Sequence, residues 1–156
     1  RQIAEVLLKI IKKEGPIHED ELVIRIRTLW GLGRAGARIQ RKVSEGIALL
    51  VSNRACQNDQ GFITTLDCVI KVRCRSDVYS SSLRKTEYLP PEEIKTAIIS
   101  VIDAHHGVTS DEIIPVVSRL FGYKSTSSSL RQVIENQIEL LKNNEIIKQQ
   151  NGFLIH

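Results

Sequence analysis

The sequence predicts an α+β protein, mainly helical, built from tandem duplicated winged helix-turn-helix units, each with three helices and a β-hairpin wing. A first observation is that Leu-Trp-Gly at 29–31 returns 91 positions later as Leu-Phe-Gly at 120–122. A second is that Gly-Phe-Ile at 61–63 and Gly-Phe-Leu at 152–154 are separated by the same offset. A third is the apolar spacing of amphipathic helices on both sides of the first pair. A helix, a glycine turn and a second helix are therefore expected twice.

The first unit is predicted to span residues 1–66 and to begin with two helices. Apolar residues at helical spacing from Ile3 to Ile11 indicate the first, which the Gly-Pro pair at 15–16 ends. Acidic residues at 19–21 place negative charge in the first turn of the second helix, where the helix dipole favours it. The buried side of that helix is predicted to consist of Leu22, Ile26, Leu29 and Trp30.

A third helix is predicted over residues 35–51, with one apolar side formed by Ile39, Val43, Ile47 and Leu50. Gly36 and Gly46 each lower its intrinsic stability by up to about 1 kcal/mol relative to alanine, so packing on the other helices must hold it. A hairpin follows, with strands at 54–57 and 62–65. Three helices followed by a two-stranded ribbon is the order of a winged helix.

Residues 67–89 are predicted to connect the two units. Apolar and basic residues alternate from Ile70 to Arg75, which indicates a strand with a basic face. A looser, serine-containing linker is expected to follow over residues 76–89.

The second unit is predicted to span residues 90–156 and to repeat the order of the first. Its first helix begins at the Pro-Pro-Glu-Glu segment at 90–93. Ser110 is expected to cap the second helix, and Pro115 to remove one of its early backbone hydrogen bonds or to delay its start. Leu120 and Phe121 are expected to pack inward. A third helix over 126–143 and a hairpin around the Asn-Gly turn at 151–152 complete the unit.

Charge is distributed unevenly along the chain. Residues 1–66 carry 11 Lys/Arg and 7 Asp/Glu, residues 67–89 carry 5 and 3, and residues 90–156 carry 6 and 8. The first unit and the connector are therefore expected to attract an anionic partner. On the outer face of the third helix, three arginines of the first copy are matched by uncharged residues in the second; the pairs are Arg34 and Ser125, Arg38 and Ser129, and Arg41 and Gln132.

One interpretation of this face is nucleic-acid binding, and the other is a solvated surface that keeps the helix soluble. In the first, the helix over 35–51 lies in or along a groove, and a basic stripe on the connector tracks the phosphate backbone. Glycine and alanine around the arginines offer little for base reading, so we expect modest sequence specificity. The candidate nucleic-acid-binding residues are Arg34, Arg38, Arg41, Lys42, Arg54, Lys71, Arg73 and Arg75.

Other functions find little support in the sequence. No apolar run approaches the ~20 residues of a membrane span. The G-x-G-x-x-G match at 31–36 follows a helix rather than the strand that a dinucleotide site needs. The three cysteines lack the paired spacing of zinc ligands and are expected to be reduced thiols. We therefore expect no cofactor, no metal and no catalytic activity. Because the chain begins at Arg1 and contains no Met, we expect it to be a piece of a longer protein.

Residues 15–22 and 29–39 resemble a family of uncharacterised winged-helix-like domains found at the C-terminus of large bacterial proteins. Those proteins look like superfamily 1 helicases and are often fused to a restriction-type or repair-type nuclease domain. Residues 88–94 also look like the family's junction into the second unit, whereas the serine-rich segment at 125–129 departs from its glycine- and arginine-containing turn.

The resemblance implies a cytoplasmic accessory module carried by a DNA-processing motor, with ATP hydrolysis and cleavage located in other domains. Its implied partners are DNA and the helicase and nuclease domains of the parent chain, with no membrane and no small-molecule substrate. The alternative is a protein-protein interaction or scaffolding module that positions those two domains, a role that the neutral outer face of the second copy suits. The two hypotheses differ on whether the three arginines lie on one open surface or are neutralised by Glu45 and neighbouring acids.

Overall fold

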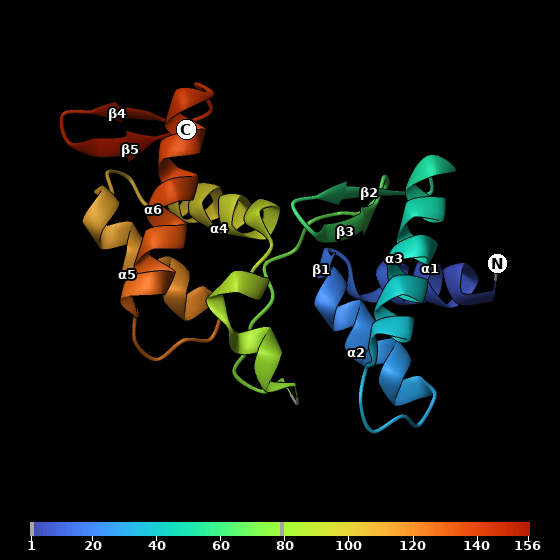
Figure 1. Ribbon diagram of the computed structural model, residues 1–156. Coiled ribbons are helices and arrows are strands. Elements are labelled where there is room, and N and C mark those ends of the chain that lie inside the picture. The colour runs from blue at the N-terminus through green and yellow to red at the C-terminus, as the bar shows by residue number, and fades with distance from the viewer. Residues whose placement is uncertain (1, 79) are drawn as a thin grey trace. The chain divides into compact units, whose positions relative to one another are not determined.

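The computed structural model describes residues 2–78 and 80–156, and it divides the chain into two units, Arg1–Val69 and Ile70–His156 (Figure 1). Each unit contains three α-helices and a small antiparallel sheet. The chain is therefore α+β and mainly helical, as the sequence predicts. The division falls inside the predicted connector, most of which belongs to the second unit.

The first unit alternates helices with short strands. Its elements are α1 (Gln2–Glu14), β1 (Ile17–His18), α2 (Glu19–Leu29), α3 (Ala37–Ser52), β2 (Cys56–Asp59) and β3 (Phe62–Thr65). The strands form one sheet in the order β1-β3-β2, with Ile17 opposite Ile63 and Cys56 opposite Thr65. Both pairings are antiparallel, so the hairpin and the strand between the first two helices are joined.

One apolar core holds this unit together. Each helix contributes a stripe at helical spacing, and the strands add buried side chains beneath it. The core residues include Leu7, Ile11, Leu22, Ile26, Val43, Ile47, Leu50 and Ile63. Gly46 lets α1 and α3 approach closely, since a Cβ atom there would lie 2.7 Å from Cδ1 of Leu7. The glycine that weakens α3 in isolation is thus required by its packing.

The second unit has the same order of elements. It begins with the 3₁₀ turns η1 (Ser81–Arg84) and η2 (Thr86–Tyr88), followed by α4 (Pro91–Ala104), α5 (Ser110–Leu120), α6 (Ser128–Asn143), β4 (Lys148–Gln150) and β5 (Phe153–Ile155). Strands β4 and β5 pair as an antiparallel hairpin, and a single bridge joins Val108 to Leu154. A second core surrounds Ile98, Phe121 and Ile134.

The two units match at the 91-residue offset. Helices α5 and α6 begin and end 91 positions after α2 and α3. The bridge between Val108 and Leu154 lies 91 positions after the pairing of Ile17 with Ile63. Left-handed backbone conformations recur at the same offset, in the pairs Gly31 and Gly122, Arg54 and Glu145, Gln60 and Asn151, and Gly61 and Gly152. Element order and turn geometry are therefore shared.

The connector differs from its prediction. Residues 68–75 form no strand, because their backbone groups bond to acceptors other than a neighbouring strand. The backbone N–H of Arg73 donates to Oε1 of Glu93 at 2.7 Å, and that of Arg75 donates to the carbonyl of Phe121 at 2.8 Å. Val72 packs against the second core, whereas Arg73 and Arg75 pair with the acid Glu93.

Several helix ends also differ from expectation. Leu29 and Trp30, predicted to be buried, are 62% and 45% exposed, whereas Phe121 is fully buried as predicted. Leu120, also predicted to pack inward, is 41% exposed.

The caps and starts of the helices differ as well. Helix α5 is capped by Thr109 rather than Ser110, in a reciprocal capping box with Glu112. Pro115 lies inside α5 without delaying its start. Helix α3 begins at Ala37, with Gly36 as its N-cap. In the ranges that the structure describes, no helix combines the length and apolar character needed to cross a bilayer.

Candidate nucleic-acid interface

The N-terminal half of α3 presents four cations to solvent. A turn over residues 30–36 precedes the helix, and Gly31 adopts the left-handed conformation there, with φ of 63°. Arg34 lies in this turn, and Arg38, Arg41 and Lys42 lie in the first two turns of the helix. All four side chains are exposed, because the opposite side of α3 packs into the first core.

Little neutralises these cations. Residues 34–45 hold four Lys/Arg and one Asp/Glu. The Nε atom of Arg41 lies 3.7 Å from Oε1 of Glu45, but both side chains are largely exposed, so the pair is worth only about 0.3–0.5 kcal/mol. Within residues 2–78 and 80–156, no ion pair forms at Arg34, Arg38 or Lys42. All three arginines are exposed, and among the described residues only Arg41 is partly compensated.

The start of α3 is also open to an anion. Its N-cap, Gly36, has no side chain to cap the helix, and its carbonyl accepts hydrogen bonds from the N–H groups of Ile39 at 2.9 Å and Gln40 at 3.2 Å, which leaves the N–H groups before them uncapped. The first N–H groups of a helix carry partial positive charge and attract anions. In the second unit the matching cap is Ser127, whose Oγ accepts a hydrogen bond from the N–H of Leu130 at 3.2 Å.

The matching face of α6 is neutral and partly covered. Residues 125–136 hold one Lys/Arg and one Asp/Glu. Gln132 donates to Asn136 at 2.9 Å, 91 positions after the pair of Arg41 and Glu45. The connector folds against this end of α6, where the hydroxyls of Thr86 and Ser129 lie 3.4 Å apart. The shared core thus supports two different surfaces.

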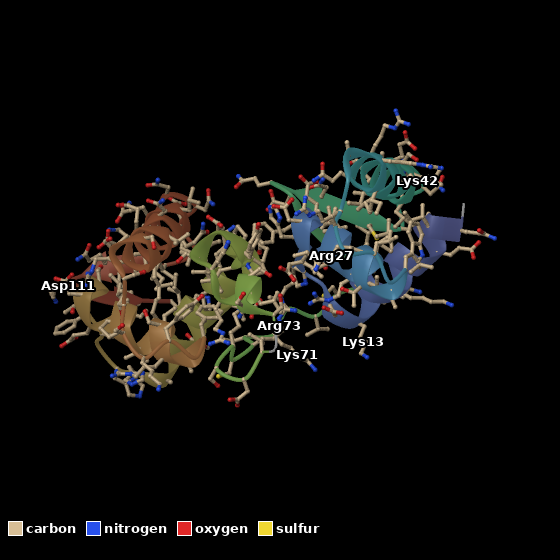
Figure 2. The ribbon with its side chains drawn as sticks, turned by 60° about the horizontal axis from the view of Figure 1, so that its bottom comes forward. Lys13, Arg27, Lys42, Lys71, Arg73 and Asp111 are labelled. Carbon is tan, nitrogen blue, oxygen red and sulfur yellow. The ribbon has the colours of Figure 1, made fainter. Side chains whose placement is uncertain are left out.

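Two other predicted site residues are exposed but belong to other segments of the chain. Arg54 is exposed just beyond the far end of α3, and the 16 residues of that helix span about 24 Å. Lys71 is exposed on the connector, in the second unit. Figure 2 marks Lys42 on α3 and Lys71 and Arg73 on the connector.

Arg73 and Arg75, predicted to track a phosphate backbone, instead form ion pairs with a buried carboxylate. Glu93 of α4 is fully buried, and its oxygens accept hydrogen bonds from Arg75 at 2.9 Å and from Arg73 at 2.8 Å. The Arg75 side chain is only 6% exposed, and its Cζ lies 5.3 Å from the centroid of the Phe121 ring. Burial raises the pKa of Glu93, but the hydrogen bonds and charges of the two arginines outweigh it and lower the pKa overall. These cations therefore hold the connector to the second unit.

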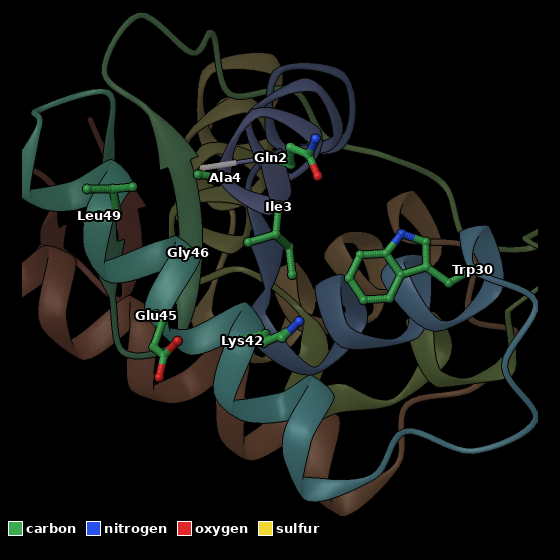
Figure 3. Close-up of a pocket in the computed structure, with 8 residues that line it drawn as sticks. All are labelled: Gln2, Ile3, Ala4, Trp30, Lys42, Glu45, Gly46 and Leu49. Atoms are coloured by element: carbon green, nitrogen blue, oxygen red, sulfur yellow. The ribbon is translucent and has the colours of Figure 1, made fainter.

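A groove beside the basic surface is lined in part by Trp30, which the helical periodicity predicts to be buried. It has a volume of about 650 Å³ and lies between the start of α1, the end of α2 and the middle of α3 (Figure 3). Its lining residues are Gln2, Ile3, Ala4, Trp30, Lys42, Glu45, Gly46 and Leu49. The position of Trp30 at the C-cap of α2 and beside a glycine turn is the sequence signal that indicates exposure.

A family described as "Protein of unknown function (DUF3320)" matches residues 1–41. The matched segment contains α1, β1, α2 and the first residues of α3, and it ends at Arg41. Comparisons with curated proteins and with solved structures gave no match. Across the described ranges, no three or more His, Cys, Asp or Glu side chains are grouped so that they could hold a metal ion.

Proposed function

We propose that the chain is a non-catalytic nucleic-acid-binding accessory module, a tandem winged helix, in which the first unit makes the contact. The observation that carries this proposal is the difference between two matching helix faces. On α3 the face is open, cationic and next to an uncapped helix start, whereas on α6 it is neutral, capped and partly covered by the connector.

The winged-helix assignment is supported by the order of elements. Each unit runs helix, short strand or bridge, helix, helix and hairpin, and the first unit has the sheet order β1-β3-β2. In a helix-turn-helix, the second helix of the motif enters the groove with its N-terminal residues toward the nucleic acid. Helix α3 takes that place here, and its N-terminal residues are the ones that carry charge.

The proposed contact is mainly to phosphates. Arg34, Arg38, Arg41 and Lys42 supply charge to the backbone, and the first N–H groups of α3, ahead of Ile39, supply donors. Gly33, Gly36 and the alanines around them add no base-reading groups, so affinity depends more on charge than on sequence. We assign Arg54 to the periphery of this contact and propose Lys71 of the second unit as an additional cation.

The scaffolding role is favoured for the second unit by a separate observation. Its hairpin region exposes large apolar side chains, with Ile146 43%, Phe153 43% and Ile155 38% exposed. Its residues 90–156 also carry more acid than base. We propose that this unit contacts the helicase or nuclease domain of a bacterial, cytoplasmic parent protein while the first unit holds DNA.

Fluorescence anisotropy tests the binding proposal. A labelled 20-base-pair duplex is titrated with the chain at several salt concentrations. Four phosphate contacts predict a log-log salt slope of about −3.6. Replacing Arg34, Arg38 and Arg41 with alanine is expected to flatten the slope to about −0.9 and to leave folding intact, since none of the three contributes to the core.

The matched control replaces Lys9, Lys12 and Lys13 of α1, which are also exposed and in the same unit. It removes the same net charge from a different surface. Equal weakening by the two variants would show only a general attraction to polyanions. No binding of the duplex or of its separate single strand at low salt would rule out the nucleic-acid role and leave the scaffold hypothesis.

A further inference from the structure

We propose that the groove beside Trp30 receives an unpaired nucleobase of single-stranded nucleic acid, which stacks on the indole while α3 holds the adjoining phosphates. The inference rests on the proposed function and adds a substrate class to it. It predicts that the first unit prefers single strands, or duplexes with an unpaired end, over blunt duplexes.

The groove has the shape and lining that a base requires. Its volume of about 650 Å³ lies within the range of roughly 300–1,000 Å³ that is usual for small-molecule sites. Ile3 and Leu49 supply apolar walls, and Gln2 and Glu45 place a donor and an acceptor on the rim. Figure 3 shows the indole of Trp30 beside Ile3, with the Lys42 side chain extending toward that side of the groove.

In the second unit, the aromatic residue that matches Trp30 is covered by a planar group. Phe121 lies 91 positions after Trp30, and the planar guanidinium of Arg75 lies over its ring at 5.3 Å. Phe121 is fully buried beneath that group and the connector, whereas Trp30 is 45% exposed. At the floor, Gly46 is matched by the buried Gln137. The first unit therefore has an aromatic ring without such a cover, while the space beside Gly46 is filled by Leu7 and Ile3 of α1.

Charge decides between a base and an apolar side chain as the occupant. Lys42 lines the groove, and Arg38 lies one turn before it on the same side of α3, at roughly 6 Å between Cβ atoms. Cations beside an aromatic platform are the combination that binds single-stranded nucleic acid, because phosphates and bases alternate along the strand. An apolar peptide segment would use the walls but leave both cations without a partner.

The test uses Trp30 as its own reporter, because it is the only tryptophan of the chain. The full chain is titrated with a 20-nucleotide oligothymidylate and with a blunt 20-base-pair duplex. Tryptophan emission and the anisotropy of labelled strands are followed in parallel. We expect the single strand to quench the emission and the duplex to leave it nearly unchanged.

Three variants locate the effect. Trp30→Leu is expected to weaken single-strand binding about 5- to 150-fold, as loss of one stacked base implies, with less than about a twofold change for duplex. Trp30→Phe is expected to restore most of the affinity, since it keeps a ring. Leu32→Ala is the matched control: Leu32 is 41% exposed in the same turn but does not line the groove.

The outcomes separate this inference from the function on which it rests. Salt-dependent binding that persists unchanged in Trp30→Leu, without quenching, would overturn the base site and leave the arginine surface in place. Absence of binding to either nucleic acid at low salt would overturn both.

Discussion

Glu93 places a charged group inside the second unit. Its carboxylate is fully buried, and two guanidinium groups neutralise it. Removing one partner of a buried ion pair leaves an uncompensated charge, which destabilises a protein by about 3–5 kcal/mol. We therefore expect Glu93→Gln to lower the free energy of unfolding of the second unit by that amount in urea denaturation at pH 7.

The matched control is Glu92→Gln, one position away. Glu92 is exposed and pairs with Lys95 at 2.8 Å on the surface of α4. A surface pair contributes about 0–1 kcal/mol, so this variant should unfold almost as the parent does. Similar losses of unfolding free energy from both substitutions would mean that the ion pairs of Glu93 with Arg73 and Arg75 contribute no more than a surface pair.

The same carboxylate makes stability depend on pH. Because the folded-state pKa of Glu93 is lowered, its contribution is fully present above the unfolded pKa and is lost as pH falls through the folded pKa. Unfolding free energy of the second unit should therefore decrease in acid, below about pH 4.3, the ordinary pKa of a glutamate. Urea midpoints measured from pH 7 to pH 3 should decrease less in Glu93→Gln than in the parent chain.

Two matching glycines separate backbone strain from packing. Gly31 and Gly122 both have left-handed φ, 63° and 88°. A Cβ at Gly31 would meet open space, whereas one at Gly122 would lie 2.6 Å from the backbone nitrogen of Ser76. Gly31→Ala should thus cost about 1–2 kcal/mol from the left-handed backbone alone.

Gly122→Ala should lose about 1–3 kcal/mol more, because the connector must also move. Amide hydrogen exchange in the two units would measure both losses. Equal losses of stability in the two variants would show that the connector does not pack against Gly122.

At the scale of elements, α3 and α6 have the same packing and different ends. Both bury apolar residues at matching positions, Val43 and Ile134, and Ile47 and Ile138.

A Ser127→Ala substitution removes the hydrogen bond to the N–H of Leu130 and should cost about 0.5–2 kcal/mol. Gly36→Ala at the matching cap has no side-chain bond to lose, but alanine is a much poorer N-cap than glycine, so its cost should be smaller than that of Ser127→Ala by only a few tenths of a kcal/mol. Thermal denaturation followed by circular dichroism compares the two, and a larger effect at Gly36 would contradict the assigned caps.

The sequence predicts the helices better than it predicts their surroundings. Helical spacing identifies Leu22, Ile26 and Val43 as core because each element carries its own periodicity. It also places Trp30 on the buried side of α2, since a helical wheel gives the direction of a side chain but not the element that covers it. In the second unit Arg75 and the connector cover Phe121.

The connector shows the same limit of sequence reasoning. Its alternation from Ile70 to Arg75 fits a strand, but the structure has an irregular segment in which Cys74 is exposed and Arg75 is buried. The deciding partners, Glu93 and Phe121, lie 18 and 46 positions after Arg75. The basic surface of α3 could be predicted because its cations are local in sequence, whereas the pairing of Arg73 and Arg75 depends on contacts that are distant in sequence.

At the scale of the whole molecule, each unit has its own core, and the connector belongs structurally to the second. The predicted boundary at residue 90 would remove Arg73 and Arg75 from the unit that contains Glu93. A fragment of residues 70–156 should therefore fold, whereas a fragment of residues 90–156 should be less stable by several kcal/mol, since a buried carboxylate is left without its partners.

Replacing Glu93 with Leu gives this comparison its control. In residues 90–156 the substitution should recover part of the lost stability, because no charge then remains buried. In residues 70–156 it should be destabilising, because Arg75 loses its acceptor. Urea denaturation of the four fragments measures the interaction between connector and acid as the difference of differences. If Glu93→Leu has the same effect in both fragments, the connector is only a linker, and the domain boundary predicted from the sequence is the correct one.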